Sequence, residues 1–242
     1  MGNPIGIDGR NPYVSWVLSD GEYQSAYEIL FEKGGKEIFT TGKVQSNDMH
    51  TKLNFDIPFK TKGTLKVFVW DENNKKSDAS EILVVTGKEK NDWTAKWINP
   101  ELENQTSSDR VASYLKSNFQ VDCLTGPVFL YATCHGIMNI YINGKEITNF
   151  QFMPGRQQYN KRLMVETIEI TDFVTTGENE VVVSLGDGFY RGSLGNSQVK
   201  NVYGTDISLL LQIESENKIL CVTDETWKAT QTTMSLKRLH HK

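Results

Sequence analysis

The sequence predicts an all-β protein made of two consecutive β-sandwich domains, the first fibronectin type III-like or immunoglobulin-like and the second a jelly roll. Apolar and polar residues alternate in short runs, which is the period-two pattern of strands with one buried face. Clusters of Gly, Asn, Asp and Pro separate these runs at spacings of about 8 to 12 residues, as in sandwich folds. Only residues 171–175 indicate a helical turn, which Thr171 would cap.

The first domain is predicted over residues 1–90. One of its strands is centred on Trp16, and Gly34-Gly35 turns the chain between two others. About seven short strands without a helical period are what a small sandwich requires. A charged joint, K-E-K-N-D at residues 88–92, then marks the domain boundary. The predicted strands cover residues 13–18, 25–33, 36–40, 53–57, 65–70 and 81–86.

The second domain is predicted over residues 91–235, followed by a tail at 236–242. Its clearest element is the strand at residues 137–142, because the Asn143-Gly144 turn that follows tolerates positive φ and predicts a hairpin returning through residues 145–148. Residues 99–110 are polar and are predicted to form a surface loop. The other predicted strands cover residues 114–121, 128–132, 163–170, 180–185, 206–214 and 218–222.

Composition excludes several classes of partner and site. The net charge of −4 and the pI near 5.7 give no basic surface for nucleic acid or anionic membranes. Cys123, Cys134 and Cys221 are an odd number without metal-ligand spacing, so they are expected to be free thiols. The sequence shows no secretory leader and no apolar run of about 18 residues, and a cytoplasmic location is therefore expected.

About a dozen motifs follow one another along nearly the whole chain, each of them weak alone. They are N-P-I-G-I-D, Trp16, S-A-Y-E-I, T-G-K-V, V-F-V-W-D, D-W-T-A-K-W-I, Y-I-N-G-K-E-I, Pro154, Tyr159 with Lys161-Arg162, I-E-I-T-D-F-V, G-E-N-E, L-G-D-G-F-Y-R-G and T-D-E-T-W-K. Taken together and in this order, they resemble the N-terminal, non-catalytic region of bacterial α-L-rhamnosidases.

The chain also departs from that family's pattern. Arg156 and Gln157 stand where the family usually has Trp and Thr, and Phe189 replaces a common Trp, so the resemblance does not extend a sugar-stacking role to those positions. The resemblance implies a catalytic (α/α)6 barrel after the second sandwich, with the acidic catalytic residues. The sequence has no helical region of that size, and we therefore expect either a fragment or a truncated relative.

No catalytic or metal-binding constellation stands out in the residues. Inverting glycoside hydrolysis needs an acid and a base about 6.5 to 9.5 Å apart in a rigid cleft, whereas the acidic residues here lie mostly in turns. We therefore nominate no catalytic residue and expect the chain alone to be inactive. No H-E-x-x-H, C-x-x-C or EF-hand motif is present. The resemblance leaves a calcium site open, because some modules of this type bind calcium beside the sugar, and Asp187 is the candidate ligand.

Carbohydrate binding is the chemistry that remains, since it needs an aromatic face and a few polar groups on loops. For the candidate residues of this function, a structural interpretation is also open. Phe189 and Tyr190 could plug the end of the sandwich, Arg191 could pair with an acid, and His135 could be a turn residue. Trp93 and Trp97, close to the joint, are expected to pack between domains. The candidate sugar-binding residues are Asp187, Tyr190 and Arg191 in G-D-G-F-Y-R-G, Arg156 and Tyr159 in a second loop, and His135 at a strand end.

Three functions follow as hypotheses. The favoured one is an accessory region of a rhamnosidase that supports a catalytic barrel and binds rhamnose-containing glycosides weakly. The second is a stand-alone carbohydrate-binding protein, and the third is a self-sufficient hydrolase. The first domain is interpreted as structural, and the surface that would contact the barrel is expected to be an exposed apolar patch.

Overall fold

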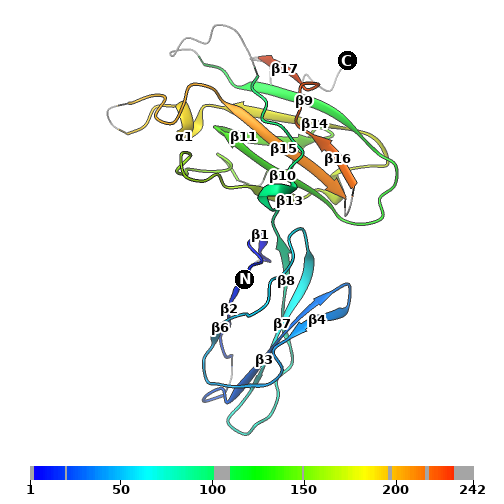
Figure 1. Cartoon of the computed structure of the whole chain (residues 1–242), viewed down its shortest axis with the longest axis vertical. Coiled ribbons are helices and arrows are strands. Elements are labelled where there is room, and N and C mark those ends of the chain that lie inside the picture. The colour runs from blue at the N-terminus through cyan, green and yellow to red at the C-terminus, as the bar shows by residue number, and fades with distance from the viewer. Residues whose placement is uncertain are drawn as a thin grey trace. The chain divides into compact units, whose positions relative to one another are not determined.

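The computed structural model describes residues 3–19, 21–100, 110–148, 150–195, 198–215 and 218–231. The chain forms two compact units, Met1–Lys90 and Asn91–Lys242, which we call domain 1 and domain 2. Both are built almost entirely of strands (Figure 1). No helix in the described ranges is long and apolar enough to cross a membrane.

Domain 1 is a sandwich of two unequal sheets. The larger sheet has the order β1-β8-β7-β3-β4, with β5 also paired to β3, and the smaller one contains β2 and β6. β1 runs parallel to β8, whereas the other pairs are antiparallel. The strands are β1 (Ile5–Ile7), β2 (Tyr13–Ser15), β3 (Ala26–Lys33), β4 (Lys36–Thr40), β5 (Val44–Gln45), β6 (His50–Lys52), β7 (Lys62–Trp70) and β8 (Ser80–Thr86).

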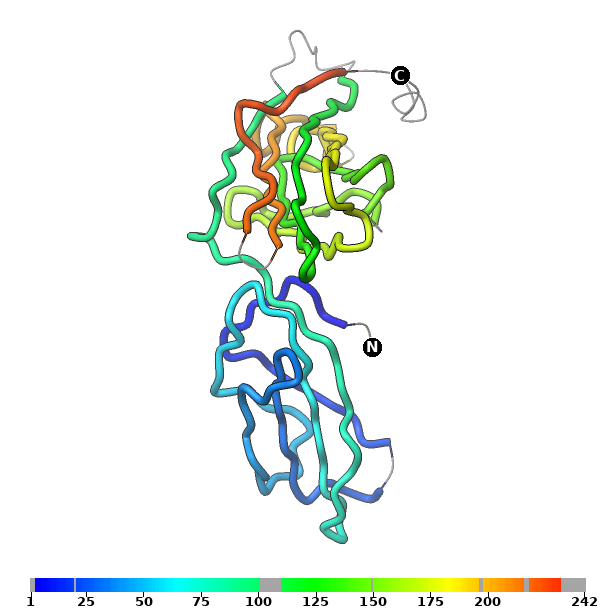
Figure 2. The backbone as a smooth tube through the Cα atoms, turned by 90° about the vertical axis from the view of Figure 1, so that its right-hand side faces the viewer, coloured from blue at the N-terminus to red at the C-terminus, as the bar shows by residue number. Residues whose placement is uncertain are grey.

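Domain 2 is a sandwich of a four-stranded sheet, β13-β10-β15-β16, and a five-stranded sheet, β12-β11-β14-β9-β17. Figures 1 and 2 show β15 and β16 side by side in orange. The elements are η1 (Lys90–Asp92), β9 (Ser113–Val121), β10 (Val128–His135), β11 (Ile137–Ile142), β12 (Lys145–Glu146), β13 (Glu166–Glu169), η2 (Thr171–Phe173), β14 (Gly177–Gly186), α1 (Gly188–Arg191), β15 (Ser208–Ser215), β16 (Lys218–Val222) and β17 (Lys228–Gln231).

The core of domain 2 lies between these two sheets. Alternate residues of β11, namely Met138, Ile140 and Ile142, are almost fully buried and pack with the inward residues of β14, as the period-two pattern predicts. The predicted hairpin is confirmed, because Asn143 and Gly144 have φ of +49° and +76° and join β11 to β12.

Some predicted elements are wrong. Residues 53–57 form no strand, since their backbone makes single bonds to loops, Leu53 N–H to the Pro12 carbonyl and Ile57 N–H to the Gly9 carbonyl, while their apolar side chains point into the core. The predicted turn at 171–175 is a 3₁₀ turn, η2, but Thr171 does not cap it. The N-cap is Ile170, and the Thr171 hydroxyl instead accepts a bond from Val128 N–H at 2.9 Å.

A further helical turn, α1, lies in the loop where none was predicted. Most of the predicted 99–110 loop and all of the predicted 236–242 tail lie outside the described residues.

Candidate functional site

The loop that follows β14 is closed by an ion pair. Arg191 Nε donates to Asp187 Oδ1 at 2.6 Å, four residues earlier, so that the pair spans the α1 turn. Arg191 is buried, and its Nη1 also donates to the Thr205 carbonyl at 2.9 Å. Arg110 Nη1 approaches the second oxygen of Asp187 at 3.3 Å. Both carboxylate oxygens of Asp187 therefore face guanidinium groups.

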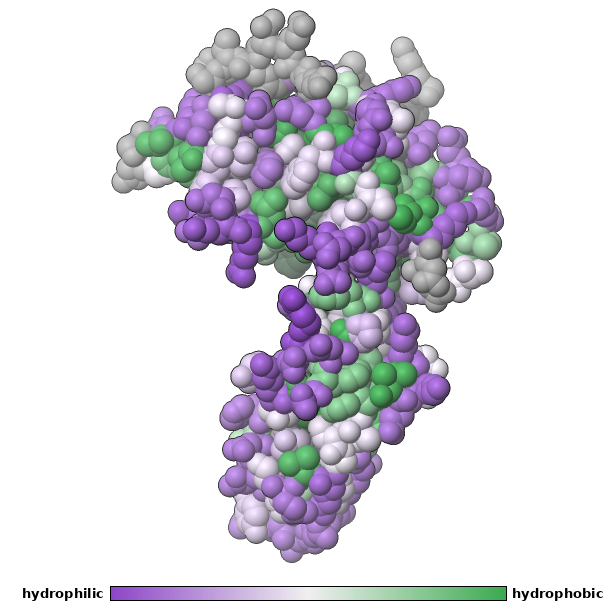
Figure 3. Space-filling model, viewed as in Figure 1, coloured by the Kyte–Doolittle hydropathy of each residue, from purple (hydrophilic) through white to green (hydrophobic). Residues whose placement is uncertain are grey.

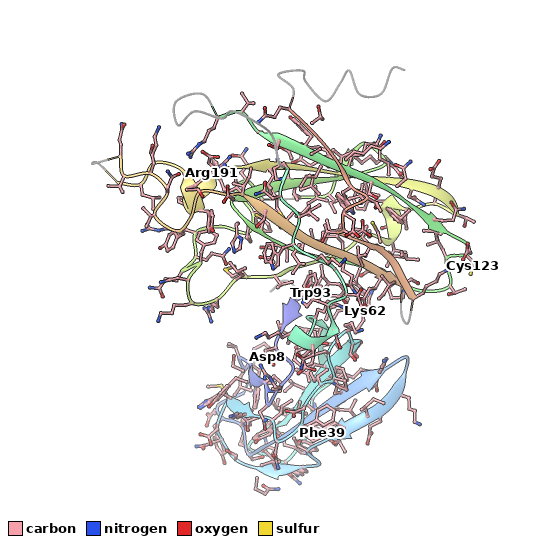
Figure 4. The ribbon with its side chains drawn as sticks, turned by 45° about the horizontal axis from the view of Figure 1, so that its top comes forward. Asp8, Phe39, Lys62, Trp93, Cys123 and Arg191 are labelled. Atoms are coloured by element: carbon pink, nitrogen blue, oxygen red, sulfur yellow. The ribbon has the colours of Figure 1, made fainter. Side chains whose placement is uncertain are left out.

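This pairing bears on two of the candidate sugar ligands. Asp187 and Arg191 are each other's partners, which is the structural interpretation that the sequence left open for Arg191. Figure 4 shows Arg191 on α1 at one end of domain 2, far from Cys123 at the other. The ion pair thus fixes the loop at that end of the sandwich, because a partly buried carboxylate with two guanidinium partners strongly favours one geometry.

Asp187 does not suit the calcium ion that the family resemblance left open. Calcium takes six to eight oxygen ligands and prefers several carboxylates. Within the described part of the chain, no group of three or more His, Cys, Asp and Glu side chains comes together. The guanidinium groups of Arg110 and Arg191 beside Asp187 would also repel a calcium ion at that carboxylate.

Three rings from separate parts of domain 2 form a stack. The Trp97 and His135 rings lie 4.5 Å apart and nearly parallel, at 6°. Tyr190 stacks on His135 at 4.7 Å and 21°. We call Trp97, His135 and Tyr190 the aromatic stack. His135 is its middle ring, and Trp97 remains 42% exposed.

Two more tyrosines continue from the aromatic stack. Tyr159 meets Tyr190 edge to face at 5.1 Å, and Tyr203 lies 5.1 Å from Tyr159. The buried Tyr159 hydroxyl donates to the Gly136 carbonyl at 3.3 Å. Burial raises the pKa of Tyr159 to about 12, an effect that Cys134 reinforces and Gln157 opposes. The phenol therefore stays protonated and remains a donor.

The protonation states of His135 and Tyr190 follow from their burial. Desolvation lowers the pKa of His135, so its imidazole is neutral near pH 7, and its Nδ1 lies 2.8 Å from the Ser208 hydroxyl. Burial, reinforced by Asp206, raises the pKa of Tyr190. The stack thus presents uncharged rings, which suits the apolar face of a neutral ligand better than an ion.

Glycine 204 gives Tyr190 its place in the stack. A Cβ at Gly204 would lie 2.2 Å from the Tyr190 hydroxyl oxygen, closer than any real Cβ contact. The backbone also connects the two segments, because Tyr203 N–H donates to the Tyr190 carbonyl at 3.2 Å and Asn201 N–H to the Arg191 carbonyl at 3.0 Å. The segment through Gly204 is therefore part of the site.

The loop between β12 and β13 contributes a polar group. Gln157 Oε1 accepts a bond from Met164 N–H at 2.6 Å. Its Nε2 is buried, and no hydrogen-bond partner for it exists among the residues that the structure describes. Arg156 beside it is exposed. The Gln157 amide lies beside the Tyr159 phenol, whose pKa it lowers, and it can also donate to an oxygen of a bound molecule.

The structure brings together some of the predicted residues and adds others. His135, Tyr159 and Tyr190 form one continuous set of rings, and Asp187 and Arg191 support it. Sequence reasoning missed Tyr203 and assigned Trp97 to packing between domains, whereas the Trp97 ring stacks on His135 within domain 2. The short segment around Trp97 reaches this place because Ile98 pairs with Leu209 of β15.

Comparisons with known proteins assign both domains. Residues 1–99 match the family described as "Rha78A-like, N-terminal immunoglobulin domain", and residues 126–241 match "Alpha-L-rhamnosidase N-terminal domain". An α-L-rhamnosidase of Alteromonas sp. (strain LOR) is 30% identical over 95% of this chain and 27% of its own length.

Solved structures agree with this assignment. The α-L-rhamnosidase structure from Dictyoglumus thermophilum matches 95% of this chain and 28% of that one, with 26% identity and a TM-score of 0.81. The structure from Aspergillus terreus has 24% identity and a TM-score of 0.84 over the same shares, which shows the fold alone.

The chain is thus a pair of β-sandwich domains, an immunoglobulin-like one followed by a jelly-roll one. More specifically, the chain belongs to the α-L-rhamnosidase family and corresponds to its N-terminal region. It spans about 27% of the length of the curated relatives that it matches.

Proposed function

We propose that the chain is the accessory region of an α-L-rhamnosidase, in which domain 2 binds rhamnosyl groups weakly at the aromatic stack and domain 1 is structural support. The observation that carries the proposal is Trp97, whose ring is held parallel to His135 yet is 42% exposed. A fixed and accessible indole suits the apolar face of a pyranose.

Polar groups beyond Tyr190 would orient a ligand longer than one sugar ring, because Trp97 and Tyr159 are separated by the rings of His135 and Tyr190. Tyr190 is a protonated phenol, and the buried Nε2 of Gln157 meets no partner within hydrogen-bonding geometry among the described residues. Sugar hydroxyls accept such hydrogen bonds, and an unsatisfied buried donor gains when a ligand supplies the acceptor. Asp187 and Arg191 would act by holding the loop rather than by touching the sugar.

Titration calorimetry of the full chain with L-rhamnose tests the proposal. Replacing Trp97 by Ala should weaken binding about tenfold, which is the loss expected for one stacking face. Tyr141→Ala is the control, because Tyr141 lies on the outward face of β11, in the other sheet of domain 2. Flat calorimetry at millimolar rhamnose, or equal affinity in the Trp97 variant, would contradict the proposal.

Two alternatives make different predictions. A stand-alone carbohydrate-binding protein would bind rhamnose as well, and only a mass measurement of the native gene product separates it from an accessory region. A self-sufficient hydrolase would turn over a nitrophenyl rhamnoside. We expect no turnover by this polypeptide alone, and measurable hydrolysis that follows the purified chain would overturn the accessory assignment.

The proposed partner of domain 2 is the catalytic barrel of the same enzyme. Exposed apolar side chains gather in the loop between β12 and β13, where Phe150 is 74% and Phe152 is 56% exposed, and Met164 is 46% exposed. In the view of Figure 3, apolar residues form several separate patches among polar ones. When no partner covers them, exposed apolar side chains favour self-association of the chain. Replacing Phe150 and Phe152 by Ser should therefore reduce self-association in light scattering, and unchanged association would remove this loop from the proposed contact.

A further inference from the structure

Domain 1 contains an open groove that the proposed function does not use. Its volume is about 540 Å³, and it lies between residues 14–19, 23 and 24 on one side and β7, β8 and their connecting loop on the other. The smaller sheet has only β2 and β6, and the groove lies along β7 and β8, where Val69 and Ile82 are only partly buried. The volume falls within the range of about 300 to 1,000 Å³ that is typical of small-molecule sites.

The floor and one wall of the groove are apolar and rigid. Leu65 and Val67 of β7 line the floor, and Trp16 stands on the wall. The Trp16 indole donates to Gln24 Oε1 at 2.7 Å and packs on the Tyr27 ring at 5.0 Å. These contacts fix one orientation of the indole.

Gln24, which accepts the hydrogen bond from the Trp16 indole, is itself buried. It is only 2% exposed, and its Nε2 donates to the Ser46 and Asp48 carbonyls at 3.0 and 2.8 Å. An amide in the core of a small sandwich is costly unless all its hydrogen bonds are made. The Gln24 amide makes three hydrogen bonds, two to backbone carbonyls and one to the Trp16 indole at the groove. The wall is therefore preorganised for a ligand.

The rest of the groove mixes an accessible aromatic ring with polar groups. Tyr23 lines it and is 54% exposed. Exposed hydroxyls and charges of both signs surround the opening, so no net charge dominates it. These residues are Ser15, Ser19, Ser80, Lys75 and Asp78.

We propose that this groove binds a short neutral saccharide of a few pyranose rings, at a site separate from the aromatic stack of domain 2. Aromatic rings and an apolar floor match the C–H faces of pyranoses, while hydroxyls and charged groups at the opening match their hydroxyl groups. Lys75 and Asp78 carry opposite charges, so the opening selects neither an anion nor a cation. Domain 1 would then add a second point of attachment to a glycan.

Saturation-transfer NMR and tryptophan fluorescence on the full chain test this site. The probes are neutral rhamnose-containing oligosaccharides of two to four rings. Tyr23→Ala should weaken their binding about tenfold. Tyr13→Ala is the matched control, because Tyr13 is an exposed tyrosine of the same domain, 76% accessible, that does not line the groove. Neither exposed position should affect folding, which the melting temperature checks.

Trp97→Ala separates this site from the one in domain 2. If the groove binds saccharide, the Trp97 variant keeps the binding that Tyr23→Ala removes, even if L-rhamnose binding at the stack fails altogether. The proposal is overturned if no oligosaccharide gives a signal that depends on Tyr23, if Tyr13→Ala has the same effect as Tyr23→Ala, or if Trp97→Ala alone abolishes all binding.

Discussion

Replacing Asp187 by Ala tests whether this carboxylate supports the loop or contacts a ligand. Arg191 is buried, and its 2.6 Å bond to Asp187 is charge-assisted. Such bonds contribute about 1.5 to 3 kcal/mol, and removing one partner of a fully buried pair costs about 3 to 5 kcal/mol. The Asp187 side chain is 24% exposed, and Arg191 keeps its bond to Thr205, so we expect a loss of about 2 to 4 kcal/mol.

The free energy should be measured for domain 2 by itself. Native-state hydrogen exchange of β14 and β15 reports local opening without assuming one transition for both domains. Glu225→Ala is the control, because its ion pair with Lys96 is 79% and 69% exposed and should contribute nothing measurable. If β14 is protected as well in Asp187→Ala as in the wild type, the ion pair does not stabilise the loop and the reasoning fails. If Asp187→Asn abolishes sugar binding at unchanged stability, Asp187 contacts the ligand and the reasoning fails as well.

Three further predictions concern domain 2. Burial lowers the pKa of His135, so as the pH falls the unfolded chain takes up this proton at a higher pH than the folded one. The free energy of unfolding should therefore decrease as the pH drops below about 6.5. His135→Phe should make that decrease smaller in denaturation curves. Gly204→Ala should displace Tyr190, whose hydroxyl oxygen would lie 2.2 Å from the new Cβ, and should lower the melting temperature; an unchanged melting temperature would contradict this. Burial raises the pKa of Cys221 to about 12 and also raises that of Cys134, so a thiol reagent at pH 8 should label only Cys123 in the native protein and all three thiols in urea.

The parts of the fold that the sequence predicts are those set by local pattern. In β11 the inward residues alternate without interruption, and Asn143-Gly144 admits one turn type, so strand and hairpin follow directly. Residues 53–57 show the same alternation, yet they form no strand, because their backbone bonds to loops rather than to a neighbouring strand. Alternation reports burial of every second side chain and says nothing about which partner the backbone finds.

The candidate site depends on contacts between distant segments, which limits what the sequence could predict. Trp97 meets His135 because Ile98 pairs with Leu209, a register that no local motif indicates. The α1 turn was more accessible to prediction, since Asp187 and Arg191 are four residues apart and opposite charges at that spacing face each other in a helical turn.

The ion pair and the aromatic stack are one unit, and this connects the stability experiment to the binding experiment. Arg191 holds the Thr205 carbonyl, and the backbone bond from Tyr203 to Tyr190 closes the same loop, so the ring of Tyr190 reaches His135 only when the loop is closed. If a ligand binds only the closed loop, its apparent dissociation constant rises in inverse proportion to the closed fraction. As long as the loop-opening free energy of an Asp187 variant stays above zero, the loop is mostly closed and the affinity should hardly change. The affinity should fall once that free energy drops below zero, and a larger loss would mean that the carboxylate itself touches the sugar.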